Sequence, residues 1–98
     1  MTLHVNVRTE AEADLAQAFE WYERQRAGLG HDFIAQARLA FRHIAESPTH
    51  HPIAHRHVRR VLLRRFPYKV FYFVESESVT IIGVVHAKRD PAFWQTRM

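Results

Sequence analysis

The span from Val58 to Val74 constrains the fold of this chain most strongly. Its second half, after Pro67, consists almost wholly of β-branched and aromatic residues, which favour buried strands. Its first half is also predicted to be a strand, although arginine pairs flank the apolar residues there. A similar apolar run follows a polar turn at 75–78. Together these runs predict three consecutive strands, over 58–66, 69–74 and 79–87.

The residues before these strands show a strand pattern and then a helix pattern. Residues 3–7 alternate apolar and polar side chains, which predicts a short first strand with one buried face. Apolar residues spaced three and four apart then predict two amphipathic helices, separated by Gly28-Leu29-Gly30 and stopped by Pro48. Thr9 and Glu12 match a capping box, in which the Thr9 hydroxyl accepts a hydrogen bond from the Glu12 amide.

The predicted order of elements is strand, helix, helix, strand, strand, strand. This order gives an α+β domain in which a helix hairpin covers one face of a largely antiparallel, twisted sheet. With 98 residues the chain has room for one core, so residues 1–98 are predicted to form a single domain. After the last strand, Trp94 is expected to fold back on the sheet. The second face of the sheet stays less covered, and we expect the functional surface there.

Positive charge is concentrated in one part of the chain. The sequence has 14 Lys and Arg against 10 Asp and Glu, a net charge of +4. The acidic residues lie mostly before Ser47, and those at Asp14, Glu20 and Glu23 are expected on the solvated face of the first helix. Residues 56–69 hold six basic residues and no acidic one. A local basic patch of this kind predicts acidic partners.

The sequence carries no sign of disulfides or of a membrane segment. It contains no cysteine, so neither disulfides nor thiolate metal sites are expected, and a reducing compartment is compatible. No apolar run approaches the roughly 18 residues that a membrane-spanning helix needs. We therefore expect a cytoplasmic protein with no membrane partner.

The segment from Thr49 to His57 is irregular and rich in histidine. Neutral imidazole is a common zinc ligand, so this segment is the first place to look for a metal site. Pro52 and Arg56 interrupt the histidines, however, and no Asp, Glu or Cys in the segment completes a ligand set. We therefore predict an exposed polar loop, no metal site and no cofactor.

Six short motifs occur in order from Ala11 to Trp94, over nearly the whole chain. They are Ala13-Asp14-Leu15 with Ala18-Phe19-Glu20-Trp21-Tyr22-Glu23, Gly28-Leu29-Gly30-His31-Asp32-Phe33, Ile44-Ala45-Glu46-Ser47-Pro48, Val58-Arg59-Arg60, Arg65-Phe66-Pro67-Tyr68-Lys69-Val70-Phe71-Tyr72 and His86-Ala87-Lys88-Arg89-Asp90-Pro91. With these motifs the sequence resembles the RelE/ParE superfamily of toxins from type II toxin-antitoxin systems. The resemblance implies a small bacterial toxin encoded beside its antitoxin.

Relatives in this superfamily divide into two activities, and the resemblance favours one of them. Some cleave messenger RNA in the ribosomal A site, whereas others poison DNA gyrase. The aromatic strand pair and the ending from His86 to Pro91 are more similar to the ParE branch. The resemblance therefore implies a DNA gyrase inhibitor, neutralised by a cognate antitoxin in a toxin-antitoxin hetero-oligomer. The alternatives are a RelE-like ribosome-dependent mRNA endoribonuclease and a degenerate member that binds only its antitoxin.

The residues expected to bind the target or nucleic acid are mostly basic. They are Arg59, Arg60, Arg64, Arg65, Lys69, Lys88, Arg89 and Trp94. Cations of this kind bind phosphates or carboxylates, although arginines on an edge strand can instead serve to prevent aggregation. Trp21 neighbours the apolar stripe of its helix without belonging to it. Together with Arg59 and Arg60 it is expected to contact the antitoxin, because aromatic residues often anchor interfaces.

A ribonuclease would need groups that activate a ribose 2′-hydroxyl, stabilise the phosphate and protonate the leaving oxygen. The resemblance to the RNA-cleaving branch places Lys69 and Arg89 as phosphate-stabilising cations, with Arg65 as a third. His86 and Glu46 are the candidate acid or base, and Trp94 is a candidate base stacker. His86 stands three residues before Arg89 on a predicted strand, so the two side chains are expected on opposite sides. The catalytic set under this reading is Arg65, Lys69, His86 and Arg89.

Overall fold

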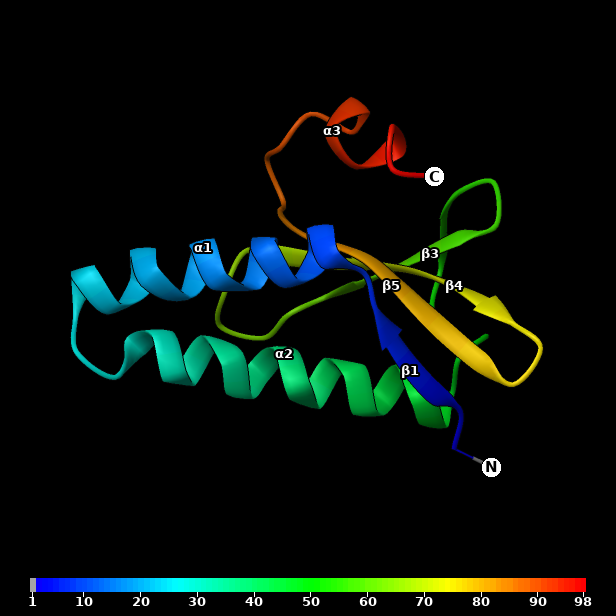
Figure 1. The fold of residues 1–98 in the computed structure, drawn as a ribbon, viewed down its shortest axis with the longest axis horizontal. Helices are drawn as coiled ribbons and strands as arrows, with labels where there is room; N and C mark the ends of the chain where they lie inside the picture. The colour runs from blue at the N-terminus through cyan, green and yellow to red at the C-terminus, as the bar shows by residue number, and fades with distance from the viewer. Residues whose placement is uncertain (1) are drawn as a thin grey trace.

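The computed structural model describes residues 2–98 and is built on a five-stranded mixed sheet (Figure 1). The strands lie in the order β1-β5-β4-β3-β2. Their bounds are β1 His4–Val7, β2 Ile53–His55, β3 Val58–Leu62, β4 Tyr68–Glu75 and β5 Ser78–His86. Strand β1 pairs parallel with β5, and the other pairs are antiparallel. The predicted α+β architecture is confirmed, with one short strand, β2, that the sequence did not predict.

Two long helices, α1 (Thr9–Gln25) and α2 (Leu29–Glu46), form the predicted hairpin (Figure 1). Their apolar faces pack on one side of the sheet, where Phe33, Ile44 and Tyr72 are fully buried. The short helix α3 (Ala92–Gln95) lies on the other side, in a second cluster that includes Trp94. The sheet therefore separates two apolar clusters, of which the one beside α3 is smaller.

The start of α1 differs from the predicted capping box. Thr9 is the first helical residue, and Arg8 is the N-cap with no side-chain hydrogen bond. The Glu12 amide donates to the Arg8 carbonyl at 3.0 Å instead of to the Thr9 hydroxyl. The physical reason is the length of the connection: the Arg8 amide donates to the Ile81 carbonyl on β5 at 3.0 Å, so the helix must begin directly after the sheet.

The joint between the two helices depends on glycine and on Glu23. Gly28 has a left-handed φ of 91°, as the sequence predicted for this joint. The Glu23 carboxylate accepts hydrogen bonds from the Gly28 amide at 3.2 Å and the Gly30 amide at 2.8 Å. The hydrogen bond from Gly28, followed by that from Gly30, lowers the pKa of Glu23. Glu23 therefore caps the start of α2, and the prediction that it is merely solvated was wrong.

Strand β3 ends at Leu62, four residues before its predicted end at residue 66. The chain bends there, and Arg65 adopts a left-handed φ of 69°. A continuing strand would point Phe66 to the same side as Arg60, away from the helix hairpin. The bend instead turns Phe66 into the core, where its ring lies 4.9 Å from that of Tyr22 and 5.4 Å from that of Phe33. Burial of this aromatic ring explains the bend.

The histidine-rich segment is tied to the sheet instead of being a free loop. The Arg59 guanidinium donates to the carbonyls of Thr49 at 3.1 Å and His51 at 2.6 Å. The Tyr72 hydroxyl donates to the Pro48 carbonyl at 2.6 Å, and burial raises the pKa of Tyr72 to about 12. His51 is half-buried, and this burial lowers its pKa. Within residues 2–98, no group of three or more acidic or histidine side chains is arranged to hold a metal ion.

The C-terminus is fastened to the first helix by a largely buried ion pair. Arg97 binds Asp14 through two contacts, of 2.6 Å and 3.1 Å, and the two side chains are 13% and 10% exposed. Asp14 also accepts the Val84 amide at 2.9 Å, and Arg97 donates to the Ile82 carbonyl at 3.1 Å. The prediction that Asp14 lies on a solvated face was therefore wrong. No helix among residues 2–98 is long and apolar enough to cross a membrane.

We expect Asp14→Ala to lower the free energy of unfolding by about 3 kcal/mol, because it leaves Arg97 buried without its partner. Urea denaturation followed by tryptophan fluorescence measures this change. Glu12→Ala, an exposed carboxylate on the same helix, is the control and should change the free energy by well under 1 kcal/mol. Equal, small losses in the two variants would contradict the assigned role of the ion pair.

The two glycines of the helix joint should respond differently to alanine. A Cβ atom at Gly30 would lie 2.5 Å from the Phe19 carbonyl oxygen and 2.7 Å from Glu23 Cγ, so Gly30→Ala must push the helices apart, at a cost of about 2 kcal/mol. At Gly28 nothing lies within 4 Å, and only the strain of the left-handed backbone, about 1 kcal/mol, is expected. Thermal unfolding of both variants checks the order, and a larger loss at Gly28 would refute it.

Candidate functional site

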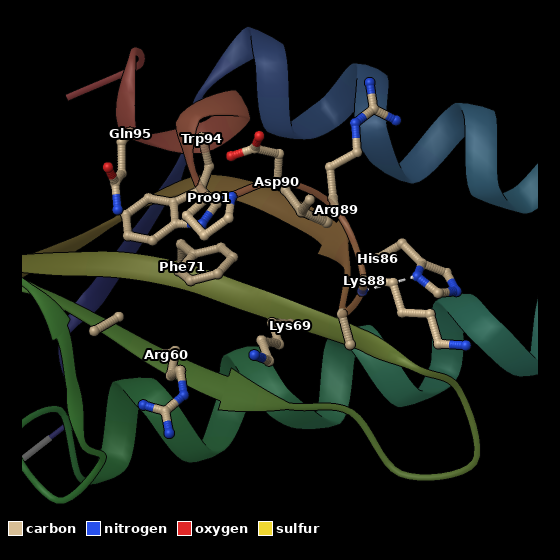
Figure 2. Close-up of a pocket in the computed structure, with 13 residues that line it drawn as sticks. Arg60, Lys69, Phe71, His86, Lys88, Arg89, Asp90, Pro91, Trp94 and Gln95 are labelled. Carbon is tan, nitrogen blue, oxygen red and sulfur yellow. Dashed lines mark hydrogen bonds between the residues drawn. The ribbon is translucent and has the colours of Figure 1, made fainter.

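A pocket of about 470 Å³ opens on the face of the sheet that carries α3 (Figure 2). Strands β2, β3, β4 and β5 contribute to it, and the chain from Ala87 to Gln95 forms its remaining wall. Its lining residues are Ala54, Arg60, Lys69, Phe71, Val85, His86, Ala87, Lys88, Arg89, Asp90, Pro91, Trp94 and Gln95. This is the face on which the sequence predicted the functional surface.

The floor of the pocket is a pair of stacked aromatic rings. Phe71 and Trp94 lie 4.0 Å apart between ring centroids, at 17° between planes, and are 4% and 5% exposed. Strands β4 and β5 shift register after Phe71, which leaves Ile82 without a paired residue and adds it to the same cluster. Trp94 folds back on the sheet as predicted, but it is too buried to act as the expected base stacker.

Four cations stand around this floor, and we call them the basic rim: Arg60, Lys69, Lys88 and Arg89. The antiparallel register places Arg60 opposite Phe71 and Lys69 opposite Leu62, so both point to the pocket side. Lys88 and Arg89 come from the turn after β5. The salt bridges among residues 2–98 join Arg65 to Asp32 and Arg97 to Asp14, and neither involves the rim.

The one acidic residue of the pocket, Asp90, forms no salt bridge with the rim. Asp90 Oδ1 accepts the Ala92 amide at 2.9 Å, so the carboxylate is used to start α3. The Arg89 guanidinium lies 3.9 Å from the centroid of the Phe93 ring, a cation–π contact that holds its head group toward α1. The four cations of the rim outnumber the one carboxylate of the pocket, so the pocket carries a net positive charge.

His86 and Arg89 line the same pocket, which corrects the expectation that they lie on opposite sides. The strand ends at His86, and the Arg89 amide donates to the His86 carbonyl at 2.9 Å, which closes a turn. His86 Nδ1 accepts the Lys88 amide at 3.1 Å. This contact occupies the Nδ1 lone pair in the structure. Glu46, the other candidate, lines a separate cavity with His43 and His50.

The remaining predicted residues lie elsewhere. Arg59 anchors the histidine-rich segment, and Arg64 lies beside α2 in a small cavity of about 50 Å³. Arg65 lies 3.5 Å from Asp32, with both side chains about half exposed. Trp21 is 50% exposed and borders a cavity of about 360 Å³. The structure thus gathers the basic rim with Trp94 and His86, and it separates the other predicted residues from this pocket.

The sequence did not identify Arg97 as part of the framework of the site. Its partner Asp14 stands 83 positions earlier in the chain, and no local pattern joins the two residues. Phe71 was predicted only as core, although it also forms the pocket floor. Its position opposite Arg60 could have indicated that it lies in the pocket. The strand register that gives this position depends, however, on the bend before β4.

The chain is similar to known proteins in sequence and in fold. The family model described as the ParE toxin of the type II toxin-antitoxin system, parDE, matches residues 5–91. Toxin ParE2 from two strains of Mycobacterium tuberculosis is 29% identical over 96 residues, covering 93% of this chain and 88% of the relative.

Two solved structures share the fold. One, the chromosomal ParDE TA system from P. aeruginosa, has a TM-score of 0.79 at 14% identity and covers 89% of this chain and 98% of that chain. The other, a mutant of E. coli toxin RelE in the free state, has a TM-score of 0.57 at 15% identity, with coverages of 99% and 94%. Since the family model spans nearly the whole chain, this protein belongs to the ParE toxin family of type II toxin-antitoxin systems.

Proposed function

We propose that this toxin inhibits DNA gyrase by binding the complex of gyrase with its DNA through the pocket and its basic rim, without catalysing a reaction. The site of action is the bacterial cytoplasm, where gyrase works on DNA. The observation that carries the proposal is the set of four cations around one pocket, none in a salt bridge. Positive charges gathered without partners repel one another, and an acidic surface or a phosphate removes this cost.

The chemistry of the pocket favours binding over RNA cleavage. A ribonuclease needs a group that accepts the 2′-hydroxyl proton, and the lone pair of His86 Nδ1 is already used by the Lys88 amide. Glu46 lies in another cavity, and the ring of Trp94 is covered by Phe71. One observation supports ribosome-dependent mRNA cleavage as the second candidate: Lys69, His86 and Arg89 share one pocket.

An antitoxin is the partner that the family gives this toxin, and we propose that it contacts Trp21. Trp21, Tyr22, Pro67, Tyr68 and His86 line a cavity of about 360 Å³ at one end of the helix hairpin. Half-exposed aromatic rings around a cavity suit an apolar anchor from a partner. His86 belongs to this cavity and to the pocket of the basic rim, so an antitoxin seated here lies against the target-binding surface.

Lys69→Ala should raise the toxin concentration needed for half-inhibition of gyrase supercoiling by about tenfold, as expected for a lost interface anchor. The assay uses purified gyrase and relaxed plasmid, with a parallel reaction of ribosomes and messenger RNA. Arg38→Ala, an exposed cation on α2, is the matched control and should leave inhibition unchanged. If the wild type inhibits gyrase and both variants inhibit it equally well, the role assigned to the rim is wrong. Cleaved messenger RNA with no gyrase inhibition would establish the second candidate.

Trp21→Ala should weaken antitoxin affinity at least tenfold, because a large aromatic contact is removed from the centre of the interface. Calorimetric titration with the antitoxin encoded beside the toxin measures this change. Leu62→Ala removes another exposed apolar side chain, which does not line the cavity, and should have little effect. Unaltered affinity of the Trp21 variant would place the antitoxin on another surface.

A further inference from the structure

The shape of the basic rim gives information on what it binds, and this inference rests on the proposed function. Figure 2 shows Arg60 on β3 pointing away from α1, while Arg89 extends toward that helix. Lys69 lies between them on β4, and Lys88 stands on the turn next to His86. The cations thus form an arc across β3, β4 and the turn after β5, and do not surround one point. A ligand that meets all four must carry negative charge at several separated positions.

The floor of the pocket argues against single-stranded nucleic acid. Binding of single strands depends on aromatic rings that are open to stacking with bases. Here Phe71 and Trp94 stack on each other and are about 95% buried, since their exposed fractions are 4% and 5%. Phe93 is covered by the guanidinium groups of Arg89 and Arg97, at 3.9 Å and 4.7 Å from its centroid. The surface offers charge without a stacking platform.

The pocket also lacks the apolar anchors that an acidic protein would use. Within residues 2–98, the exposed large apolar side chains are Trp21, Ile53, Leu62 and Met98. None of the four lines the pocket, although Leu62 lies beside it as the cross-strand neighbour of Lys69. Protein interfaces draw most of their affinity from buried aromatic and apolar contacts, with charged residues at the edge. A rim of four cations around a floor with no exposed large apolar side chain instead matches the sequence-independent recognition of a phosphate backbone.

We propose that the basic rim binds the phosphate backbone of duplex DNA, independent of base sequence. Duplex DNA carries regularly spaced phosphates and keeps its bases stacked inside, so it needs the arc of cations and no aromatic platform. The toxin then contacts gyrase and the DNA held by gyrase at the same time, and the rim is the DNA side of that contact.

The test is the salt dependence of DNA binding by the purified full-length toxin. Fluorescence anisotropy with a labelled 20-base-pair duplex gives the affinity at several potassium chloride concentrations. Four phosphate contacts predict a slope of about −3 to −4 for log affinity against log salt, and the double variant Arg60→Ala/Lys69→Ala should make it shallower by about 2. The charge-matched control, Arg38→Ala/Arg42→Ala, removes two exposed cations from α2 and should keep the wild-type slope. Circular dichroism checks that all variants are folded.

Three outcomes would overturn the proposal. The first is the absence of salt-dependent binding. The second is tighter binding of a single-stranded oligonucleotide of equal length. The third is that poly-glutamate, at equal charge, displaces the labelled duplex as well as unlabelled duplex does. Gyrase supercoiling measured with the same preparations separates this inference from the proposed function. Inhibition without DNA binding refutes only the DNA contact, whereas DNA binding without inhibition refutes only the gyrase target.

Discussion

The ion pair between Asp14 and Arg97 holds together parts of the chain that are far apart in sequence. It joins the first helix to the last residues, and both partners also bind the backbone of β5. Gly83 leaves room for this approach, because a Cβ atom there would lie 3.0 Å from Arg97 Nη1. The Arg8 guanidinium adds a 2.7 Å hydrogen bond to the Arg97 carbonyl. The chain end is therefore fixed at a position set by β1, α1 and β5.

The functional pocket depends on this fastening. Helix α3 precedes Arg97 directly, so the ion pair keeps Trp94 stacked on Phe71. That stack provides the floor, and the turn from Ala87 to Asp90 provides one wall. The rim cations stand on elements of different kinds, with Arg60 and Lys69 on rigid strands and Lys88 and Arg89 on the turn. The charged surface therefore consists of two cations on strands and two on a turn.

Much of the fold could be predicted from the sequence because its elements are strongly periodic. The helix hairpin, the first strand and the aromatic strand pair follow from local patterns of apolar residues. The errors arose where a contact distant in sequence determined the structure. Strand β3 ends early because Phe66 is buried in the core. The capping box does not form because the Arg8 amide bonds to the sheet, and Asp14 is not solvated because it pairs with Arg97. Three of the seven predicted basic residues, Arg59, Arg64 and Arg65, lie outside the pocket.

His86 occupies an unusual place among the side chains of this surface. It lines the pocket of the basic rim, the cavity beside Trp21, and a cavity of about 220 Å³ between them. Its ring packs edge-on against Tyr68, with centroids 5.3 Å apart, and Nδ1 is held by the Lys88 amide. The imidazole is thus a shared partition between adjoining compartments. A substitution at position 86 therefore changes the shape of all three cavities at once, and none of the three can be altered there without altering the other two.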